Sequence, residues 1–155
     1  MPFLEADEEI KKKIKGKEYT NERLKKIIAL EKERITKFSD LPVAVKFIFM
    51  SGEYDTELLV WKKSDKNGAK KSLEDVLDFL NNFSVQAWKK DRIEKETGEW
   101  IGKKGLTNRE VLWPLRVALS GQKNSPGPFE IMEVLGKDET INRVKTAIQK
   151  LSVNA

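Results

Sequence analysis

Apolar residues recur along the chain every three or four positions, which is the spacing of an amphipathic helix. This repeat predicts helices within residues 20–35, 72–83, 84–98, 107–120, 125–136 and 138–151. Thr20 is a plausible N-cap of the first, and Thr107 with Glu110 three positions later predicts a capping box at the start of the fourth. The last of these segments places Ile141, Val144, Ile148 and Leu151 on one helical face. No internal repeat of fixed period and no convincing sheet pattern accompanies them. The chain is therefore predicted to be all-α.

One segment fits two structures. Residues 43–49, "VAVKFIF", alternate β-branched and aromatic side chains, which is typical of a strand. We favour a helix because helical patterns flank the segment on both sides. Ser39 or Asp40 would then cap it, with Pro42 in its first turn.

Glycine-rich stretches suggest the domain organisation. Residues 51–72 predict a loop around the short apolar piece "ELLVW", and "KKSDK" within it indicates a surface turn leading into "NG". Ser72 would start the helix that follows. "GEWIGKKG", residues 98–105, has three glycines in eight positions and indicates a junction. We therefore expect two small helical subdomains, 1–100 and 101–155.

The amino-acid composition excludes several kinds of site. The 155 residues contain no histidine and no cysteine, so a Ser-His-Asp triad and the usual zinc sites are impossible. The acidic runs "EADEE" and "KDET" are typical of solvated faces or helix N-termini. No run of about 20 apolar residues indicates a membrane span, and the N-terminus lacks the apolar core of a secretory signal. We expect no catalytic residue, metal or cofactor in this chain.

Positive charge is concentrated in the C-terminal third. The net charge of the whole chain is +5, and residues 103–155 carry nine Lys or Arg against five Asp or Glu. Neutralising phosphates releases counterions, so such an excess indicates a polyanionic partner.

Residues 111–119 continue a helical pattern through Pro114, which should kink the helix because proline lacks an N–H group. Arg116 follows the kink. The turn "NSPG" comes next, and Ser125 followed by Pro126 predicts the start of another helix. Helix N-termini of this kind bind phosphates or base edges.

Trp113, Pro128 and Phe129 lie close to this turn in the sequence and could offer flat surfaces for stacking a base. The same residues also fit a purely structural explanation, in which packing requires the kink at Pro114 and Trp113 and Phe129 lie in the core.

The stretch "WPLRVALSGQKNSPGPFEIMEVLGKDETINRV", residues 113–144, resembles the C-terminal signature of bacterial glutamyl-tRNA synthetases. "PFLEADEE" and "ERITKFSDLPVAVKFIF" resemble earlier parts of the same region. The resemblance implies the α-helical cage that binds the anticodon in this family of class I aminoacyl-tRNA synthetases. The two ATP-site motifs of the family's catalytic half are missing here. Because the family continues N-terminally from "MPFL", we expect the chain to be the anticodon-binding piece of a longer ligase.

The resemblance also implies a set of residues that contact the anticodon. Arg34 matches the arginine near the third anticodon base, which helps the family separate tRNA-Glu from tRNA-Gln. Arg116 matches the arginine that faces the anticodon. The turn that packs against anticodon bases corresponds to Ser125, Pro126, Gly127 and Pro128. The family commonly has Thr at position 125 and a larger apolar residue at 128. Trp113 stands where relatives often have a polar residue, and its stacking role is our own inference.

The partners follow from the same resemblance. They are the anticodon loop of tRNA-Glu and the catalytic domain of the parent synthetase, which alone would use ATP and Mg²⁺. The protein is expected to be cytoplasmic and monomeric. Two alternatives stay open, a non-catalytic basic helical module that binds RNA or protein, and a small enzyme using carboxylates and lysines. The lack of histidine disfavours the enzyme. Strictness toward tRNA-Gln is open as well.

Overall fold

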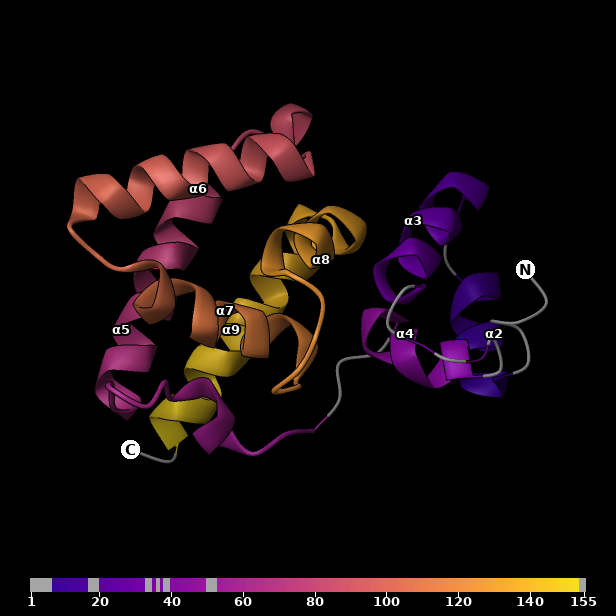
Figure 1. Cartoon of the computed structure of the whole chain (residues 1–155), viewed down its shortest axis with the longest axis horizontal. Helices are drawn as coiled ribbons and strands as arrows, with labels where there is room; N and C mark the ends of the chain where they lie inside the picture. Colours follow the sequence, from indigo (N-terminus) through magenta and orange to yellow (C-terminus); the bar gives the residue numbers. More distant parts are fainter. Residues whose placement is uncertain are drawn as a thin grey trace. The chain divides into compact units, whose positions relative to one another are not determined.

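The computed structural model describes residues 7–16, 20–32, 35, 37, 40–49 and 53–153 (Figure 1). All regular structure in these ranges is helical, with eight α-helices and two 3-10 helices. The predicted all-α class is therefore confirmed. The chain divides into two compact units, Met1–Gly52 and Glu53–Ala155.

Unit 1 consists of α2 (Glu8–Gly16), α3 (Asn21–Glu31) and α4 (Leu41–Phe49). Thr20 caps α3 by accepting a hydrogen bond from the Arg23 backbone N–H at 3.1 Å. Its apolar interior is formed by Ile10, Leu24, Ile27 and Val45. The helix preferred for residues 43–49 is confirmed, because they lie in α4, which packs against α2 and α3.

A small ion-pair cluster joins α2 to α4. The Lys46 ammonium lies 2.7 Å from the Glu9 carboxylate and 3.6 Å from that of Asp7. The hydrogen bond with Glu9 raises the pKa of Lys46. Asp7 accepts hydrogen bonds from the backbone N–H groups of Ile10 and Glu9, which lower its pKa and cap α2.

Unit 2 holds the remaining elements. In chain order these are η2 (Thr56–Leu59), α5 (Lys66–Asn81), η3 (Val85–Ala87), α6 (Lys90–Lys104), α7 (Asn108–Ser120), α8 (Pro128–Leu135) and α9 (Lys137–Val153). Helix α9 packs along α5 and α7, and α6 packs against α8 (Figure 1). The largest fully buried side chains are Leu59, Leu73, Leu80, Ile93, Leu115, Leu119, Ile131 and Met132.

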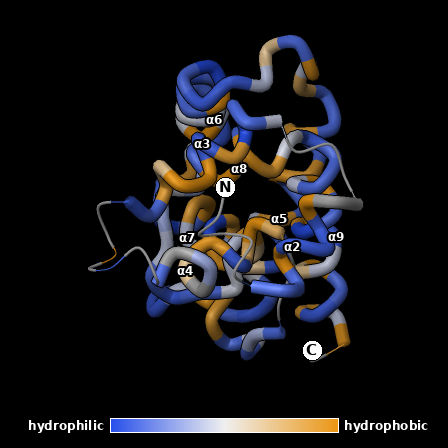
Figure 2. Tube along the Cα trace, turned by 90° about the vertical axis from the view of Figure 1, so that its right-hand side faces the viewer, coloured by the Kyte–Doolittle hydropathy of each residue, from blue (hydrophilic) through white to orange (hydrophobic). Residues whose placement is uncertain are grey.

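Figure 2 shows apolar and polar residues alternating along these helices, as expected when each helix has one buried side. Among the described residues, no helix is long and apolar enough to cross a bilayer.

Several predicted helix boundaries are wrong. The helix predicted from residue 84 begins at Lys90, and Val85–Ala87 form the separate 3-10 helix η3. Helix α5 begins at Lys66, not at Ser72, because the Asp65 carboxylate accepts a hydrogen bond from the Gly68 N–H at 2.7 Å. The "NG" pair therefore lies in the first helical turn and forms no separate turn. Helix α6 passes through Gly98 and ends at Gly105, whose φ of 68° closes the helix in the left-handed region.

The expected subdomain boundary at 100/101 falls inside α6. The boundary between the two compact units lies after Gly52 in the sequence. A glycine inside a helix costs only about 1 kcal/mol relative to alanine. The contacts of α6 with α7 and α8 offset that cost, so Gly98 and Gly102 do not interrupt the helix, whereas Gly105 ends it.

Candidate nucleic-acid interface

The first turn of α7 is fixed by a capping box. The Thr107 hydroxyl accepts a hydrogen bond from the Glu110 N–H at 3.3 Å, and the Glu110 carboxylate accepts one from the Thr107 N–H at 2.8 Å. This second bond lowers the pKa of Glu110. The predicted capping box is confirmed. It holds Asn108 and Arg109 in a defined place at the start of the helix.

Pro114 lies in the middle of α7, and its ring is buried. The helix continues to Ser120 although Pro114 cannot donate a hydrogen bond to the Glu110 carbonyl. Buried neighbours on the same helix, Val111, Leu115 and Ala118, hold this face against the core. Burial of this apolar face thus stabilises the helix beyond Pro114, where the missing backbone hydrogen bond would favour its end.

Side chains satisfy the carbonyl groups at the C-terminal end of α7. The Ser120 hydroxyl donates to the Arg116 carbonyl at 2.8 Å, and the buried Arg143 guanidinium donates to the Leu119 carbonyl at 2.7 Å. Gly121, with φ of 67°, then turns the chain away. The chain that leaves α7 consequently starts the 121–127 turn from a fixed point.

Trp113 and Arg116 form the centre of the candidate site. The Trp113 indole N–H donates a hydrogen bond to the Leu58 carbonyl in η2 at 2.9 Å. The Arg116 guanidinium carbon lies 5.2 Å from the centre of the Trp113 ring, within cation–π range. Arg116 Nη1 also donates to the Ser125 hydroxyl at 3.2 Å. Arg116 is therefore held between an aromatic face and the turn before α8.

A cavity of about 200 Å³ lies beside this pair. It is lined by Asn108, Arg109, Leu112, Trp113, Arg116 and Pro128. The volume is below the roughly 300–1,000 Å³ of pockets that enclose whole small-molecule ligands. The lining contains two guanidinium groups, one amide and three apolar groups, and no carboxylate. Such a lining suits one planar, hydrogen-bonding ring next to negative charge.

The structure gathers most of the predicted site residues. Trp113, Arg116 and Pro128 line one cavity, and Ser125 joins them through Arg116. Pro126 is buried, and its carbonyl accepts a hydrogen bond from the Ser125 hydroxyl. Arg34 lies outside the described residues.

The predicted start of the last-but-one helix is wrong. Helix α8 begins at Pro128 with Gly127 as its N-cap, so Ser125 and Pro126 precede the helix. Pro128 takes the first helical position instead, where its fixed φ and missing N–H are favourable. Trp113 and Phe129 are both half-buried, so neither is fully enclosed in the core.

Sequence reasoning missed Asn108, Arg109 and Leu112 as lining residues. The signal was available in the helical spacing. Arg109 and Leu112 precede Trp113 and Arg116 by four positions each, which places all four on neighbouring rows of α7. Among the described residues, no group of three potential metal-ligating side chains occurs.

The comparisons with known proteins agree with this geometry. The model of the anticodon binding domain family matches residues 1–148. A glutamate–tRNA ligase of Clostridium acetobutylicum is 41% identical over 131 residues, which is 83% of this chain and 27% of the relative. That of Lachnoclostridium phytofermentans is 37% identical over 147 residues, covering 91% of this chain and 28% of the relative. The chain thus spans about a quarter of the length of these curated relatives.

Solved structures give the same result. The crystal structure of a glutamate–tRNA ligase from Elizabethkingia meningosepticum superimposes with a TM-score of 0.75 at 28% identity, covering 97% of this chain and 29% of that one. The helical architecture and the matched residues together lead to one conclusion. The chain belongs to the anticodon-binding domain family.

Proposed function

We propose that this chain recognises the anticodon loop of tRNA-Glu as the RNA-binding part of a glutamate–tRNA ligase. The observation that carries the proposal is the cavity beside Trp113 and Arg116, which suits a single base. The relatives of similar sequence are glutamate–tRNA ligases, which supports the choice of tRNA. RNA-binding proteins that read sequence bind splayed single-stranded bases, and an anticodon loop presents such bases.

The two central side chains have different tasks in this proposal. The Trp113 N–H is already bonded to Leu58, so the indole offers a base its ring surface and no hydrogen-bond donor. The Arg116 guanidinium group is planar and has five N–H donors, one of which bonds to Ser125. Its planar fork can read the edge of a base. Stacking therefore retains the base, and Arg116 tells one base from another.

Arg34 belongs to the same proposal through the resemblance alone. We assign it to the third anticodon base and to the rejection of tRNA-Gln. Ser125, Pro126, Gly127 and Pro128 form the turn against which the bases pack. The ligation itself, with ATP and Mg²⁺, takes place in the catalytic part of the parent enzyme, which we place in the cytoplasm as a monomer. This chain contributes no catalytic residue.

The alternative is a basic helical module that follows phosphates without reading bases. Titration of the chain with tRNA-Glu and tRNA-Gln transcripts and an unrelated hairpin, at one salt concentration, separates the two. An anticodon reader prefers tRNA-Glu over both others. Equal affinity for all three RNAs contradicts the proposal and favours the basic module.

A further inference from the structure

Several cations of unit 2 form ion pairs with a nearby carboxylate. In unit 2 the ion pairs join Lys66 to Glu57, Lys70 to Glu74, Lys71 to Asp75, Lys90 to Glu130, Arg92 to Glu96 and Arg143 to Glu139. Lys63, Arg109 and Lys123 differ from these residues. All three are exposed, and within the part of the chain that the structure describes no carboxylate forms an ion pair with them.

One of these cations lies at the cavity beside Trp113, and the other two lie close in sequence to residues that hold the site together. Arg109 lines the cavity itself. Lys63 comes five residues after Leu58, whose carbonyl holds the Trp113 indole. Lys123 comes two residues before Ser125, whose hydroxyl holds Arg116. The chain near Lys63 and the chain near Lys123 are thus each tied to the site by one of these two hydrogen bonds.

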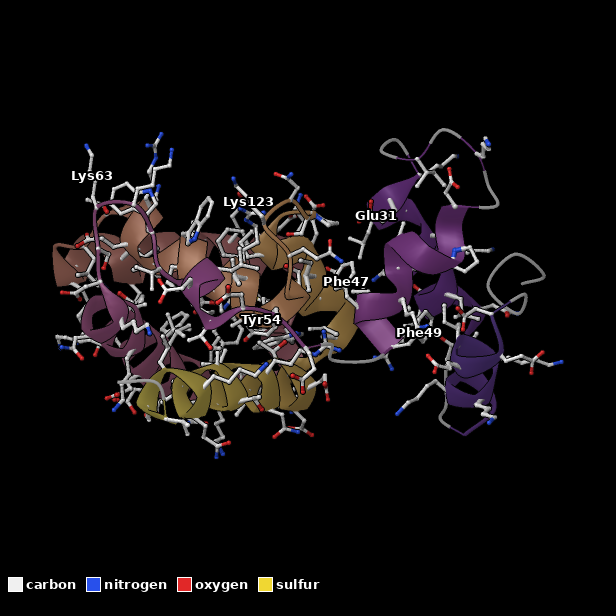
Figure 3. All side chains as sticks on the ribbon, turned by 90° about the horizontal axis from the view of Figure 1, so that it is seen from below. Glu31, Phe47, Phe49, Tyr54, Lys63 and Lys123 are labelled. Carbon is white, nitrogen blue, oxygen red and sulfur yellow. The ribbon has the colours of Figure 1, made fainter. Side chains whose placement is uncertain are left out.

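The side chains also share a direction. Figure 3 shows Lys63 and Lys123 projecting to the same side of unit 2, with the yellow α9 on the opposite side. An RNA strand with one base in the cavity needs phosphate contacts on both sides of that base, because its backbone continues in both directions. Lys63 follows the segment that holds Trp113, Lys123 precedes the residue that holds Arg116, and Arg109 lies at the cavity.

The local charge favours a polyanion at this cavity over the other large one. The cavity of about 460 Å³ between α5 and α6 is larger, but its lining has three carboxylates, Asp75, Asp78 and Glu96, against Arg92 and Lys104. The lining beside Trp113 has two cations and no carboxylate. A phosphate backbone is attracted only to the second.

We propose that Lys63, Arg109 and Lys123 form a phosphate-binding strip that carries the RNA backbone past the cavity, while Arg116 alone reads the base. This inference rests on the proposed function and extends it to residues that the family resemblance did not supply. The proposal assigns affinity for RNA and selectivity for the anticodon to different residues. The strip supplies salt-dependent affinity for any single strand, and removing it leaves the preference for one anticodon intact.

The test compares two triple variants of equal net charge. Lys63→Ala/Arg109→Ala/Lys123→Ala removes the strip, and Lys95→Ala/Lys103→Ala/Lys145→Ala removes three exposed cations from α6 and α9. Each is titrated with an RNA hairpin carrying the glutamate anticodon and with a hairpin of altered anticodon, from about 0.1 to 1 M salt. Each single-strand phosphate contact contributes about 0.7 to the slope of log K against log salt. We expect the strip variant to lose about two units of slope and roughly 100-fold in affinity at 0.1 M salt.

The outcomes separate the two proposals. The strip is supported if its loss lowers the slope, the control variant changes it little, and the ratio between the two hairpins stays that of the wild type. An equal loss of slope in both triple variants overturns the strip, because net charge alone then explains binding. A wild-type slope in the strip variant overturns it as well. If the wild-type chain binds RNA without any anticodon preference, the proposed function fails while the strip can still stand. Binding to neither hairpin by the wild type overturns both.

Discussion

Arg116 is placed before any partner arrives. Its guanidinium group already contacts the Trp113 ring and the Ser125 hydroxyl. A side chain that is ordered in advance loses less conformational entropy when it binds. Lysine has the same charge but lacks the planar fork, so it serves as a probe for the role of Arg116.

We predict that Arg116→Lys lowers affinity for the glutamate anticodon without changing the salt slope. A bidentate base contact is worth roughly 1–3 kcal/mol of discrimination in nucleic-acid readout, and lysine cannot reproduce it. Titrations of wild type and variant at two salt concentrations measure both quantities. Unchanged selectivity in the variant shows that Arg116 does not read a base.

Tyr54 raises a separate question of stability. Its ring packs at Gly121, where an added Cβ would lie 3.1 Å from the Tyr54 Cδ1 atom, and the Lys150 ammonium lies 3.8 Å from the ring centre. The buried Tyr54 hydroxyl has no hydrogen-bond partner among the described residues. Burial raises the pKa of Tyr54 to about 12, against the opposing influence of Arg143.

We therefore predict that Tyr54→Phe folds with equal or greater stability, because it removes a buried polar group that lacks a partner. The raised pKa of Tyr54 also determines how the stability of the wild type changes with pH. Stability due to neutral Tyr54 is complete below the unfolded pKa of about 10 and is lost as pH rises toward 12. Denaturant unfolding of both proteins between pH 8 and 12 tests this. The stability of the variant relative to the wild type should therefore increase as pH rises from 10 toward 12, and a large loss of stability in Tyr54→Phe at neutral pH contradicts the prediction.

At the scale of single elements, α7 carries the site because both of its ends are defined. The capping box sets its start at Asn108, and Arg143 and Gly121 set its end. Five of the six lining residues of the cavity lie on the helix between those points, and the sixth, Pro128, begins α8. A substitution at either end of α7 should therefore affect RNA binding by lowering the stability of the helix or by displacing the residues that line the cavity.

We predict that Thr107→Ala lowers the stability of the protein by about 1 kcal/mol, the usual loss for an N-cap threonine. Because the capping box lowers the pKa of Glu110, its contribution is present above the unfolded pKa of Glu and is lost as pH falls through the folded pKa. Thermal unfolding at pH 7 and at pH 3 tests both statements. Thr107→Ser, which keeps the hydroxyl, is the control, and equal stability of Ala and Ser variants at pH 7 contradicts the role of the cap.

Pro114→Ala tests the interrupted helix. Alanine restores an N–H group for the Glu110 carbonyl, and proline is about 3 kcal/mol less favourable than alanine inside a helix. We expect the variant to fold at least as stably as the wild type but to bind RNA more weakly. Removing the proline should alter the direction of α7 just before Arg116 and so displace that side chain. Circular dichroism melts and RNA titration are measured together. Wild-type values in both would show that the proline has no functional meaning.

The elements that sequence reasoning found are those with local signals. The Thr107–Glu110 capping box and the Thr20 cap depend on residues within three positions of each other, and both are confirmed. The start of α5 at Lys66 was missed because "NG" suggested a turn, whereas Asp65 supplies a stronger local cap. The passage of α6 through Gly98 depends on contacts with distant helices, which no local pattern contains.

The site divides in the same way. The resemblance supplied Arg116 and Pro128, but the Trp113–Leu58 hydrogen bond spans 55 positions and joins α7 to a 3-10 helix that was predicted as loop. Arg109 was passed over because it has no motif of its own. Only the cavity shows that it lies next to Trp113.

At the scale of the whole molecule, the division after Gly52 separates the two assigned anticodon arginines. Arg34 belongs to the first unit by sequence, and Arg116 to the second. The second unit has its own buried core and includes every residue that lines the cavity. In the proposed function, the reading of different anticodon bases is thus divided between two units that each have an apolar interior.

We predict that a fragment of residues 53–155 folds cooperatively and binds the glutamate anticodon hairpin in an Arg116-dependent way. It should not distinguish tRNA-Glu from tRNA-Gln, because Arg34 is absent. Circular dichroism and titration with both transcripts test this, with Arg34→Lys in the full chain as the matched comparison. If the fragment keeps the full preference for tRNA-Glu, the discrimination resides in unit 2 and not in Arg34.

The hydrogen bond that holds Trp113 goes to a main-chain atom, the carbonyl of Leu58. Evolution can therefore vary the side chain at position 58 without moving the indole. It cannot as easily vary the number of residues between the Asp55 cap of η2 and that carbonyl, because one inserted or deleted residue would present a different carbonyl at a different angle. Related sequences that keep a tryptophan at this place should therefore tolerate substitutions in η2 while keeping its length.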